Sequence, residues 1–204
     1  TVFALIDGNS FHCSCERVFD PRLATRPVIV LSNNDGCAVA RTAEAKALGI
    51  KMGHPWFQIR DLCRQNRVAV FSSNYTLYGD MSARMNEVYH LFSPDVEVYS
   101  IDESFLDLSG MGRRDLVAHA RELRATVRRW TGIPTCVGLG PTKTLAKLAN
   151  WTAKHDPSLD SVCDFTDEAK RLAVMAKIPV GKVWGIGPAS ARKLQALGCM
   201  TAAD

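Results

Sequence analysis

Val-Glu-Val-Tyr-Ser-Ile-Asp-Glu-Ser-Phe-Leu-Asp-Leu, residues 96–108, places two adjacent carboxylates between two short apolar runs. The apolar residues of 96–101 fit one strand and those of 105–108 fit another, with Asp102 and Glu103 between them. Neighbouring side chains within a strand point to opposite faces, but local twisting at a hairpin tip or strand end can present both to one site. The segment therefore predicts two strands joined by an acidic pair.

A third carboxylate ends another apolar run. Residues 2–6, Val-Phe-Ala-Leu-Ile, indicate a buried strand, and Asp7 follows directly. If these strands meet in one mixed sheet, Asp7, Asp102 and Glu103 share an edge. Such oxygen donors suit magnesium, and two magnesium ions can activate an attacking hydroxyl and stabilise a leaving pyrophosphate. The alternative is that Asp7 caps a turn and that the Asp-Glu pair is simply solvated.

A lysine-rich helix is expected after a glycine-rich entry, with Pro141 opening it. Lys143, Lys147 and Lys154 fall within a narrow arc, because residues four and eleven apart return to nearly the same azimuth. The free N–H groups at a helix start favour an anion, so this helix suits a triphosphate. The alternative is a solvated lysine face.

Gly185-Ile186-Gly187 lies between two predicted short helices, 166–176 and 188–197, the second ended by Gly198. Glycines let the backbone approach a DNA phosphate, and the following helix start adds donors. With basic residues nearby, the pattern predicts a helix-hairpin-helix that binds DNA without reading its sequence. A plain tight turn is the alternative.

The remaining pattern predicts further elements and one domain boundary near residue 160. Strands are expected at 28–31 and 135–139, and helices at 11–19, 39–48, 75–91 and 115–130. The predicted 39–48 helix carries Arg41 and Lys46, which reach phosphate oxygens if the helix faces a nucleotide and otherwise form an exposed charged face.

The composition suits one or two globular domains. The 204 residues are 47% hydrophobic and 23% charged, and the net charge of +4 permits a nucleic-acid partner without proving one. The seven cysteines show neither Cys-x-x-Cys nor zinc-finger spacing, so we expect buried thiols in a reducing cytosol. No apolar run approaches the ~20 residues of a membrane span. We expect a cytoplasmic protein with no membrane partner.

Six segments occur in an order that resembles the Y-family translesion DNA polymerases, and within them the UmuC branch, the catalytic subunits of bacterial DNA polymerase V. The segments are 4–11, 31–37, 43–49, 71–75, 99–105 and 141–149. Ser-Ile-Asp-Glu at 100–103 is the most specific in this company, and Ser-Asn-Asn-Asp-Gly-Cys at 32–37 points to the UmuC branch. The resemblance covers essentially the whole chain.

The resemblance implies an α+β fold: a right-hand polymerase palm with a mixed sheet and helices, a small fingers domain, and a helical thumb with the helix-hairpin-helix. The palm is expected at 1–27 and 72–160, the fingers at 28–71, and the thumb at 161–204. Members of the family carry a further little-finger domain after the thumb, and we expect this chain to lack that region.

The implied function is error-prone, template-directed transfer of deoxynucleotides to a primer 3′-hydroxyl in the DNA-damage (SOS) response. Two magnesium ions are expected on Asp7, Asp102 and Glu103, with the Gly8 carbonyl as a further ligand. The residues implied to bind the deoxynucleoside triphosphate are Phe11, His12, Ala43, Lys46 and Lys147. The residues expected to bind primer-template DNA are Lys143, Gly185, Gly187, Arg192 and Lys193.

Two positions depart from the family pattern. His12 stands where the family usually has an aromatic steric gate, commonly tyrosine, that excludes the ribose 2′-hydroxyl. Ala43 stands where many relatives have a phosphate-binding tyrosine. The resemblance also implies a UmuD-type accessory dimer, a RecA filament and the sliding clamp as partners.

Two rival functions follow from the same residues. The chain could be a binding or regulatory module that occupies DNA or a polymerase without catalysis, or a different two-metal enzyme such as a nucleotidyl cyclase-like palm. Primer extension separates the first rival from a polymerase. A requirement for primer-template DNA separates the second.

Overall fold

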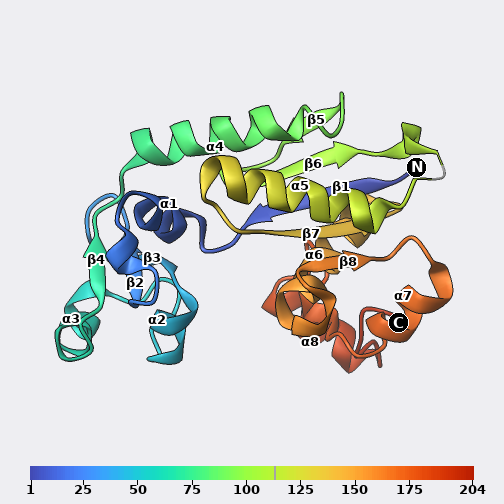
Figure 1. Cartoon of the computed structure of the whole chain (residues 1–204). Helices are drawn as coiled ribbons and strands as arrows, with labels where there is room; N and C mark the ends of the chain where they lie inside the picture. The colour runs from blue at the N-terminus through green and yellow to red at the C-terminus, as the bar shows by residue number, and fades with distance from the viewer. Residues whose placement is uncertain (113) are drawn as a thin grey trace. The chain divides into compact units, whose positions relative to one another are not determined.

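The computed structural model describes residues 1–112 and 114–204 (Figure 1). The chain divides into two compact units. The five-stranded unit consists of Thr1–Asp7, Asn86–Thr126 and Thr135–Asp204, and the three-stranded unit of Gly8–Met85 and Val127–Pro134. Among the described residues, no helix combines the length and the apolar character that crossing a bilayer requires.

The five-stranded unit is built on a mixed sheet with the strand order β5-β6-β1-β7-β8. β1 pairs antiparallel with β6, β6 pairs antiparallel with β5, and β7 runs parallel to β8. The predicted strands are confirmed, except that β5 ends at Val98 rather than at residue 101 and that Glu103 belongs to β6 rather than to the connection. β8 was not predicted. The bounds are β1 Phe3–Gly8, β5 Val96–Val98, β6 Glu103–Asp107, β7 Thr135–Gly140 and β8 Val162–Asp164.

Helix α6, Lys143–His155, packs against β7 and β8 and closes a hydrophobic core of this unit. Every residue of β7 is buried, as expected for a strand covered by a helix. The packed side chains are Cys136, Leu148, Ala149, Ala153, Cys163, Phe165 and Ile178. The sequence prediction that Pro141 opens α6 is wrong, because the Thr142 side chain caps the helix by accepting a bond from the Leu145 N–H.

The C-terminal residues form the predicted pair of short helices. α7, Glu168–Met175, begins two residues after the predicted start at 166, because the Asp167 side chain caps the helix by accepting the Lys170 N–H at 2.8 Å. α8, Pro188–Ala196, is confirmed. It ends before Gly198, whose φ of 93° requires glycine.

The three-stranded unit has the order β3-β2-β4, with β2 antiparallel to β3 and parallel to β4. The bounds are β2 Val28–Leu31, β3 Ala38–Arg41 and β4 Ala69–Phe71. Its core contains Ile29, Leu31, Ala38, Ala45, Ile50, Ile59, Cys63 and Val68.

The predicted helix 39–48 is wrong in its first part. Residues up to Arg41 form β3, and only α2, Ala43–Ala47, is helical. The alanines favour a helix, but main-chain pairing with β2 outweighs that weak preference. Thr42 ends the strand and caps the helix, and its hydroxyl also accepts the Val28 N–H at 3.1 Å.

The other predicted helices are confirmed within a few residues, and helix α3 was not predicted. Their apolar stripes are buried, for example Tyr78, Met81 and Met85 on α4. The bounds are α1 Phe11–Phe19, α3 Trp56–Gln65, α4 Tyr75–Tyr89 and α5 Leu116–Thr131. Four short 3₁₀ turns complete the described elements: η1 Pro21–Leu23, η2 Ser109–Met111, η3 Pro157–Leu159 and η4 Val180–Lys182. All seven cysteines are free, and all but Cys37 and Cys199 are buried.

Candidate active site

The register of β1 and β6 brings the predicted acidic residues to one end of the strand pair. Asp7 and Glu103 face each other as partners in the antiparallel ladder, and Asp102 directly precedes β6. The pairing depends on the buried strand interiors, since a slip by one residue would turn the Leu5 and Phe105 side chains out of the core. Asp7, Asp102 and Glu103 are therefore held together at one end of this strand pair, and we call this group the acidic edge of the sheet.

Ser100 fixes the turn that carries the acidic pair. Its hydroxyl donates to Asp102 Oδ1 at 2.7 Å and accepts the Glu103 N–H at 3.1 Å. The N–H groups of Tyr99 and Ser100 both donate to the Glu103 carbonyl at 3.0 Å. These bonds close a tight hairpin, and the charges of both Asp102 and Glu103 act on Asp7 from it.

Helix α6 supplies one lysine to each of three carboxylates on the sheet. Lys154 Nζ lies 2.5 Å from Asp7 Oδ2, and Lys147 Nζ lies 2.8 and 3.0 Å from the two oxygens of Glu103. Lys143 pairs with Glu97. The predicted common face is confirmed. The lysines are ion-paired rather than solvated, and the Lys147 side chain is only 18% exposed.

Two features hold α6 in the position that makes these pairs. The buried Asn150 amide donates to the carbonyls of Leu5 and Cys136, at 3.2 and 2.9 Å, and so ties the helix to β1 and β7. Gly138 on β7 has no room for a side chain, because a Cβ there would lie 2.1 Å from the backbone nitrogen of Asn150. The helix backbone therefore rests directly on β7.

Burial governs the electrostatics of Asp7. Loss of solvent raises the pKa of its carboxyl from 3.8 to about 6, although Lys154 lowers it, and the charges of Asp102 and Glu103 raise it further. Tyr89 is also buried beside the site, and desolvation followed by the charges of Asp7 and Asp102 raises its pKa. The Tyr89 hydroxyl has no hydrogen-bond partner among the described residues.

The arrangement fits magnesium in its donor set. Carboxylate oxygens crowd one edge, and two of the three carboxylates are already balanced by a cation, the ammonium of Lys154 or Lys147. The described residues contain no group of three His, Cys, Asp or Glu side chains already arranged as a ligand cage. A divalent ion on Asp7 and Glu103 would therefore exchange with the lysines. Metal ligation by these residues stays a prediction.

Two aromatic rings, those of Tyr99 and Trp184, flank the Lys147 ammonium, and we call this pair the aromatic cage. Nζ lies 4.5 Å from the centre of the Tyr99 ring and 5.2 Å from that of Trp184. The Tyr99 and Trp184 rings meet edge to face at 5.4 Å, and Trp184 also packs against Phe105. Trp184, which directly precedes Gly185, is therefore in cation–π contact with the lysine of the Lys147–Glu103 pair.

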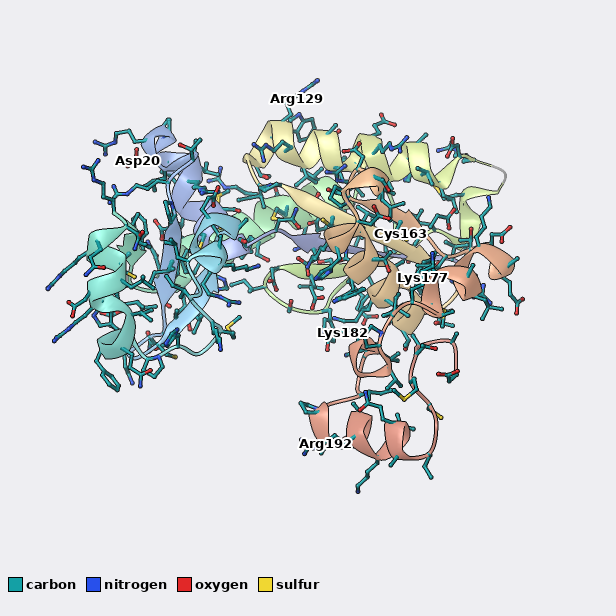
Figure 2. All side chains as sticks on the ribbon, turned by 90° about the horizontal axis from the view of Figure 1, so that it is seen from below. Asp20, Arg129, Cys163, Lys177, Lys182 and Arg192 are labelled. Atoms are coloured by element: carbon teal, nitrogen blue, oxygen red, sulfur yellow. The ribbon has the colours of Figure 1, made fainter. Side chains whose placement is uncertain are left out.

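The predicted DNA-binding segment has the expected backbone. Gly185 has a φ of 88°, and Gly187 is the N-cap of α8. A Cβ at either glycine would meet nothing within 4 Å, so this backbone is open to a ligand. Arg192 and Lys193 are exposed on α8, and Figure 2 shows Arg192 there with Lys182 on the preceding turn. Lys143 instead lies against Glu97 and the Phe105 ring.

The predicted nucleotide-binding residues other than Lys147 belong to the three-stranded unit. Phe11 is buried in α1, and a Cβ on Gly8 would lie 3.0 Å from its ring. The His12 ring packs edge to face on Tyr78 at 4.7 Å. Ala43 and Lys46 are exposed on α2. The nucleotide-binding roles of these residues stay predictions.

Four residues at the acidic edge were missed as site residues. Lys154 was placed on the lysine face but not assigned to the site, and its spacing of seven from Lys147, two helical turns, was the available signal. Ser100 could have been found as a turn-forming serine beside the acidic pair. Tyr89 and Trp184 gave no signal, because only the tertiary fold brings them there.

Comparisons with known proteins agree with this architecture. Residues 6–151 match the impB/mucB/samB family, and residues 169–198 match the IMS family HHH motif. The chain is 50% identical to Protein ImpB of Salmonella typhimurium over 98% of its length, and 50% identical to Protein UmuC of Salmonella typhimurium over its whole length. It spans about half of each relative, 48% and 49%.

Solved structures share the fold at low sequence identity. DinB from Sulfolobus solfataricus superposes with a TM-score of 0.84 at 23% identity, over 98% of this chain and 58% of that one. The insertion ternary complex of Dbh DNA polymerase gives 0.85 at 22% identity, over 98% and 59%. The fold is thus the α+β core of the Y-family polymerases, and with the family match over more than half of its residues the chain belongs to the impB/mucB/samB family, the UmuC branch of the Y family.

Proposed function

We propose that this chain is the catalytic core of an error-prone translesion DNA polymerase that acts in the DNA-damage (SOS) response. It transfers deoxynucleotides to a primer 3′-hydroxyl as directed by a template. The observation that carries the proposal is the pairing of Asp7 with Glu103 at adjoining strand positions, with Asp102 beside them and lysines on two of the three.

The carboxylates of Asp7, Asp102 and Glu103 would hold two magnesium ions, with the Gly8 carbonyl as a further ligand. Bound magnesium supplies a lowered pKa for the attacking hydroxyl and charge neutralisation at the phosphates. The protein's part is to keep the three carboxylates preorganised, through the Ser100 turn and the β1–β6 register. Asp7 ionises fully only above its raised pKa of about 6, so ion binding strengthens as pH rises through that value.

Lys154 and Lys147 of α6 would bind the triphosphate. Their ammonium groups neutralise Asp7 and Glu103 in this structure, and if those carboxylates held metal ions, each ammonium would be available to a negatively charged triphosphate oxygen. Lys154 joins Lys147 and Lys46 in this proposal because it lies against Asp7. Positive charge at these positions opposes the negative charge that develops on the leaving pyrophosphate. Phe11, His12 and Ala43 would bound the sugar and phosphates.

The DNA duplex would bind at the open glycine backbone of Gly185 and Gly187 and at Arg192 and Lys193, with Lys143 adding a further contact. These are phosphate contacts, which position a duplex without selecting sequence. As the family resemblance implies, a UmuD-type accessory dimer, a RecA filament and the sliding clamp are the partners that we propose for this chain.

Primer extension tests the proposal directly. The chain is incubated at high concentration with primer-template DNA, magnesium and all four deoxynucleotides, beside its Asp102→Ala, Glu103→Ala double variant. We expect extension by the parent and none by the variant, with no turnover when primer-template is omitted. Turnover without primer-template would instead favour a cyclase-like enzyme, and DNA binding without any extension would favour a binding module.

Sugar selection gives a second expected result. His12 lies in α1, at the position where the family resemblance places a steric gate, and its ring packs edge to face on Tyr78 of α4. Imidazole is smaller than phenol and offers its own hydrogen-bonding nitrogen, so we expect ribonucleotides to be incorporated more readily by the parent than by a His12→Tyr variant, by about tenfold or more. The ratio of kcat/KM for deoxy- and ribonucleotides measures this, and equal ratios in the two proteins would contradict it.

A further inference from the structure

We propose that the three-stranded unit carries a separate binding surface for single-stranded DNA, in the arginine-lined pocket between α3 and the starts of β2 and β4. It goes beyond the proposed function, because none of its residues belongs to the acidic edge or to the helix-hairpin-helix. The pocket has a volume of about 680 Å³, within the usual range of ligand sites.

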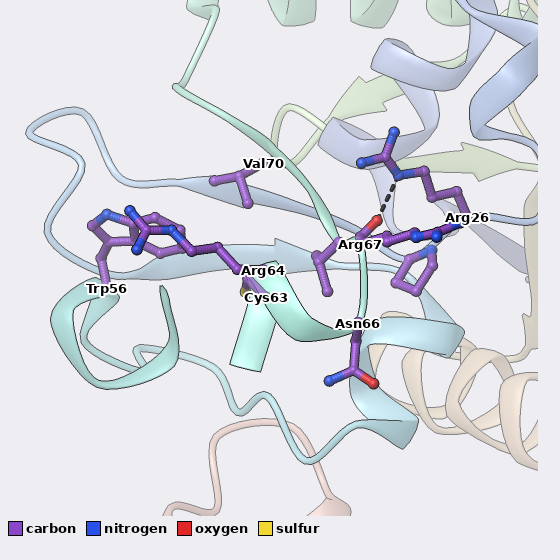
Figure 3. A pocket seen from close by; sticks show the side chains of 9 residues that line it. Arg26, Trp56, Cys63, Arg64, Asn66, Arg67 and Val70 are labelled. Carbon is purple, nitrogen blue, oxygen red and sulfur yellow. Dashed lines mark hydrogen bonds between the residues drawn. The ribbon is translucent and has the colours of Figure 1, made fainter. Parts of the chain in front are cut away.

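The pocket combines positive charge with an apolar, aromatic wall. Arg26, Arg64 and Arg67 line it from three segments of the unit, and Trp56, Asn66 and Val70 lie among them (Figure 3). All three arginines are exposed, while Trp56 is half-buried against the core and therefore held in place. Guanidinium groups bind phosphates through two parallel hydrogen bonds, and an indole stacks on any nucleobase.

Little negative charge balances these arginines. The segment 56–67 contains Arg60, Arg64 and Arg67 but a single carboxylate, Asp61. Arg64 meets Asp61 at 3.7 Å, but both side chains are more than 70% exposed, so this pair is weak and readily exchanged for a phosphate. Arg26 and Arg67 form no ion pair with any described carboxylate. The net positive charge therefore complements a polyanion.

The backbone keeps the arginines presented together. Arg26 Nε donates to the Arg67 carbonyl at 2.5 Å, which joins the segment before β2 to the segment before β4 (Figure 3). Arg17 Nη2 in turn donates to the Arg26 carbonyl at 2.7 Å. Arg67 has a φ of 51°, a left-handed conformation that an arginine adopts at a cost. The Arg67 side chain is exposed and lines the pocket rather than entering the core.

Single-stranded DNA fits this surface better than a duplex or a lone phosphate. Arginines from three segments match successive phosphates along a strand, and Trp56 can stack only on a base that is not paired and buried within a helix. An acidic protein segment would use the arginines but would leave the indole face without a matched partner. We therefore assign the pocket to an unpaired stretch of nucleic acid, of any sequence.

The test measures binding of a labelled oligothymidylate of about 16 nucleotides by fluorescence anisotropy, without magnesium or nucleotides. An Arg64→Gln, Arg67→Asn double variant should bind about tenfold more weakly, with a salt slope shallower by about 1.4, because two phosphate contacts are lost. Asparagine accepts the left-handed backbone at position 67, so the variant should keep the parent's melting temperature. An Arg121→Gln, Arg129→Gln variant on α5 removes the same charge elsewhere and should bind like the parent.

Tryptophan fluorescence provides an independent readout. Stacking on Trp56 should quench emission when the oligonucleotide binds, and the quench should be lost in Trp56→Phe to the extent that it comes from this residue. Loss of affinity in the Arg64/Arg67 variant together with a Trp56-dependent quench supports the proposal. Equal affinity of this variant and the parent, or an equal loss in the α5 control, overturns it, whatever the result of primer extension.

Discussion

The metal-free Asp7→Asn variant is expected to be more stable than the parent protein near pH 7.5 and yet to have lost primer extension. The Asp7 side chain is 12% exposed, and burial raises its pKa to about 6 even with Lys154 beside it. Ionised Asp7 therefore costs folding free energy at neutral pH. The neutral amide should remove between about 1 and 3 kcal/mol of this cost, while activity with magnesium should fall at least about 10²-fold.

The stability difference between the Asp7→Asn variant and the parent should depend on pH. The carboxyl binds its proton more tightly in the folded protein, at a pKa of about 6, than in the unfolded chain near 3.8. Its contribution therefore makes the parent more stable as the pH falls from about 7 to about 4, and the Asn variant lacks this gain. Thermal unfolding with a chelator, measured near pH 7.5 and near pH 5, should show the difference shrinking at the lower pH. An unchanged difference would contradict the assignment.

Asp107→Asn is the matched control on the same strand pair. The Ser109 N–H and hydroxyl lower the pKa of Asp107, which is the opposite shift from that of Asp7. Its ionised form stabilises the fold above the unfolded pKa, and that contribution is lost as pH falls. The control variant should thus be slightly less stable at neutral pH and should keep extending primers, because it lies at the far end of the register from Asp7.

Gly138→Ala is expected to disrupt the five-stranded unit. The new Cβ would lie 2.1 Å from the Asn150 nitrogen, 2.2 Å from the Ala146 carbonyl oxygen and 2.7 Å from Asn150 Cα. These are backbone atoms, so relief requires α6 to move away from β7. The destabilisation should exceed the about 1–3 kcal/mol of ordinary overpacking, and the protein should be recovered mainly unfolded or aggregated.

Gly79→Ala provides the contrasting result. Gly79 lies within α4 and is exposed, and a Cβ there meets nothing within 4 Å. Alanine should stabilise that helix by about 0.5–1 kcal/mol. Circular dichroism melts of the two variants beside the parent decide the matter. A Gly138→Ala protein that melts like the parent would contradict the close packing of α6 on β7.

The sequence predicted the local elements that have strong patterns. The apolar runs before Asp7 and around Phe105 gave the right strands because both are buried on both faces. It failed where main-chain pairing decides, as at Val39–Arg41, whose alanine-rich surroundings favour a helix. β4 and β8 are three residues long and leave too short a pattern to recognise.

The candidate site was predictable in its residue types but not in its pairings. Spacing placed Lys147 and Lys154 on one face, yet nothing local indicates that one meets Glu103 and the other Asp7. Those pairs depend on where α6 crosses the sheet, which Gly138 and Asn150 decide through long-range packing. The strand pattern and the family resemblance both indicated the acidic residues, and only the tertiary structure shows which lysine pairs with each.

The cage around Lys147 gives the five-stranded unit a thermodynamic link between two distant functions. Trp184 precedes the glycines proposed to bind duplex phosphates, and its ring touches the cation that neutralises Glu103. A ligand that moves this indole changes the free energy of the Lys147–Glu103 pair. By reciprocity, an event that breaks the pair must alter that ligand's affinity by the same factor. Ligand binding at the acidic edge and the affinity of the helix-hairpin-helix for duplex DNA would then depend on each other.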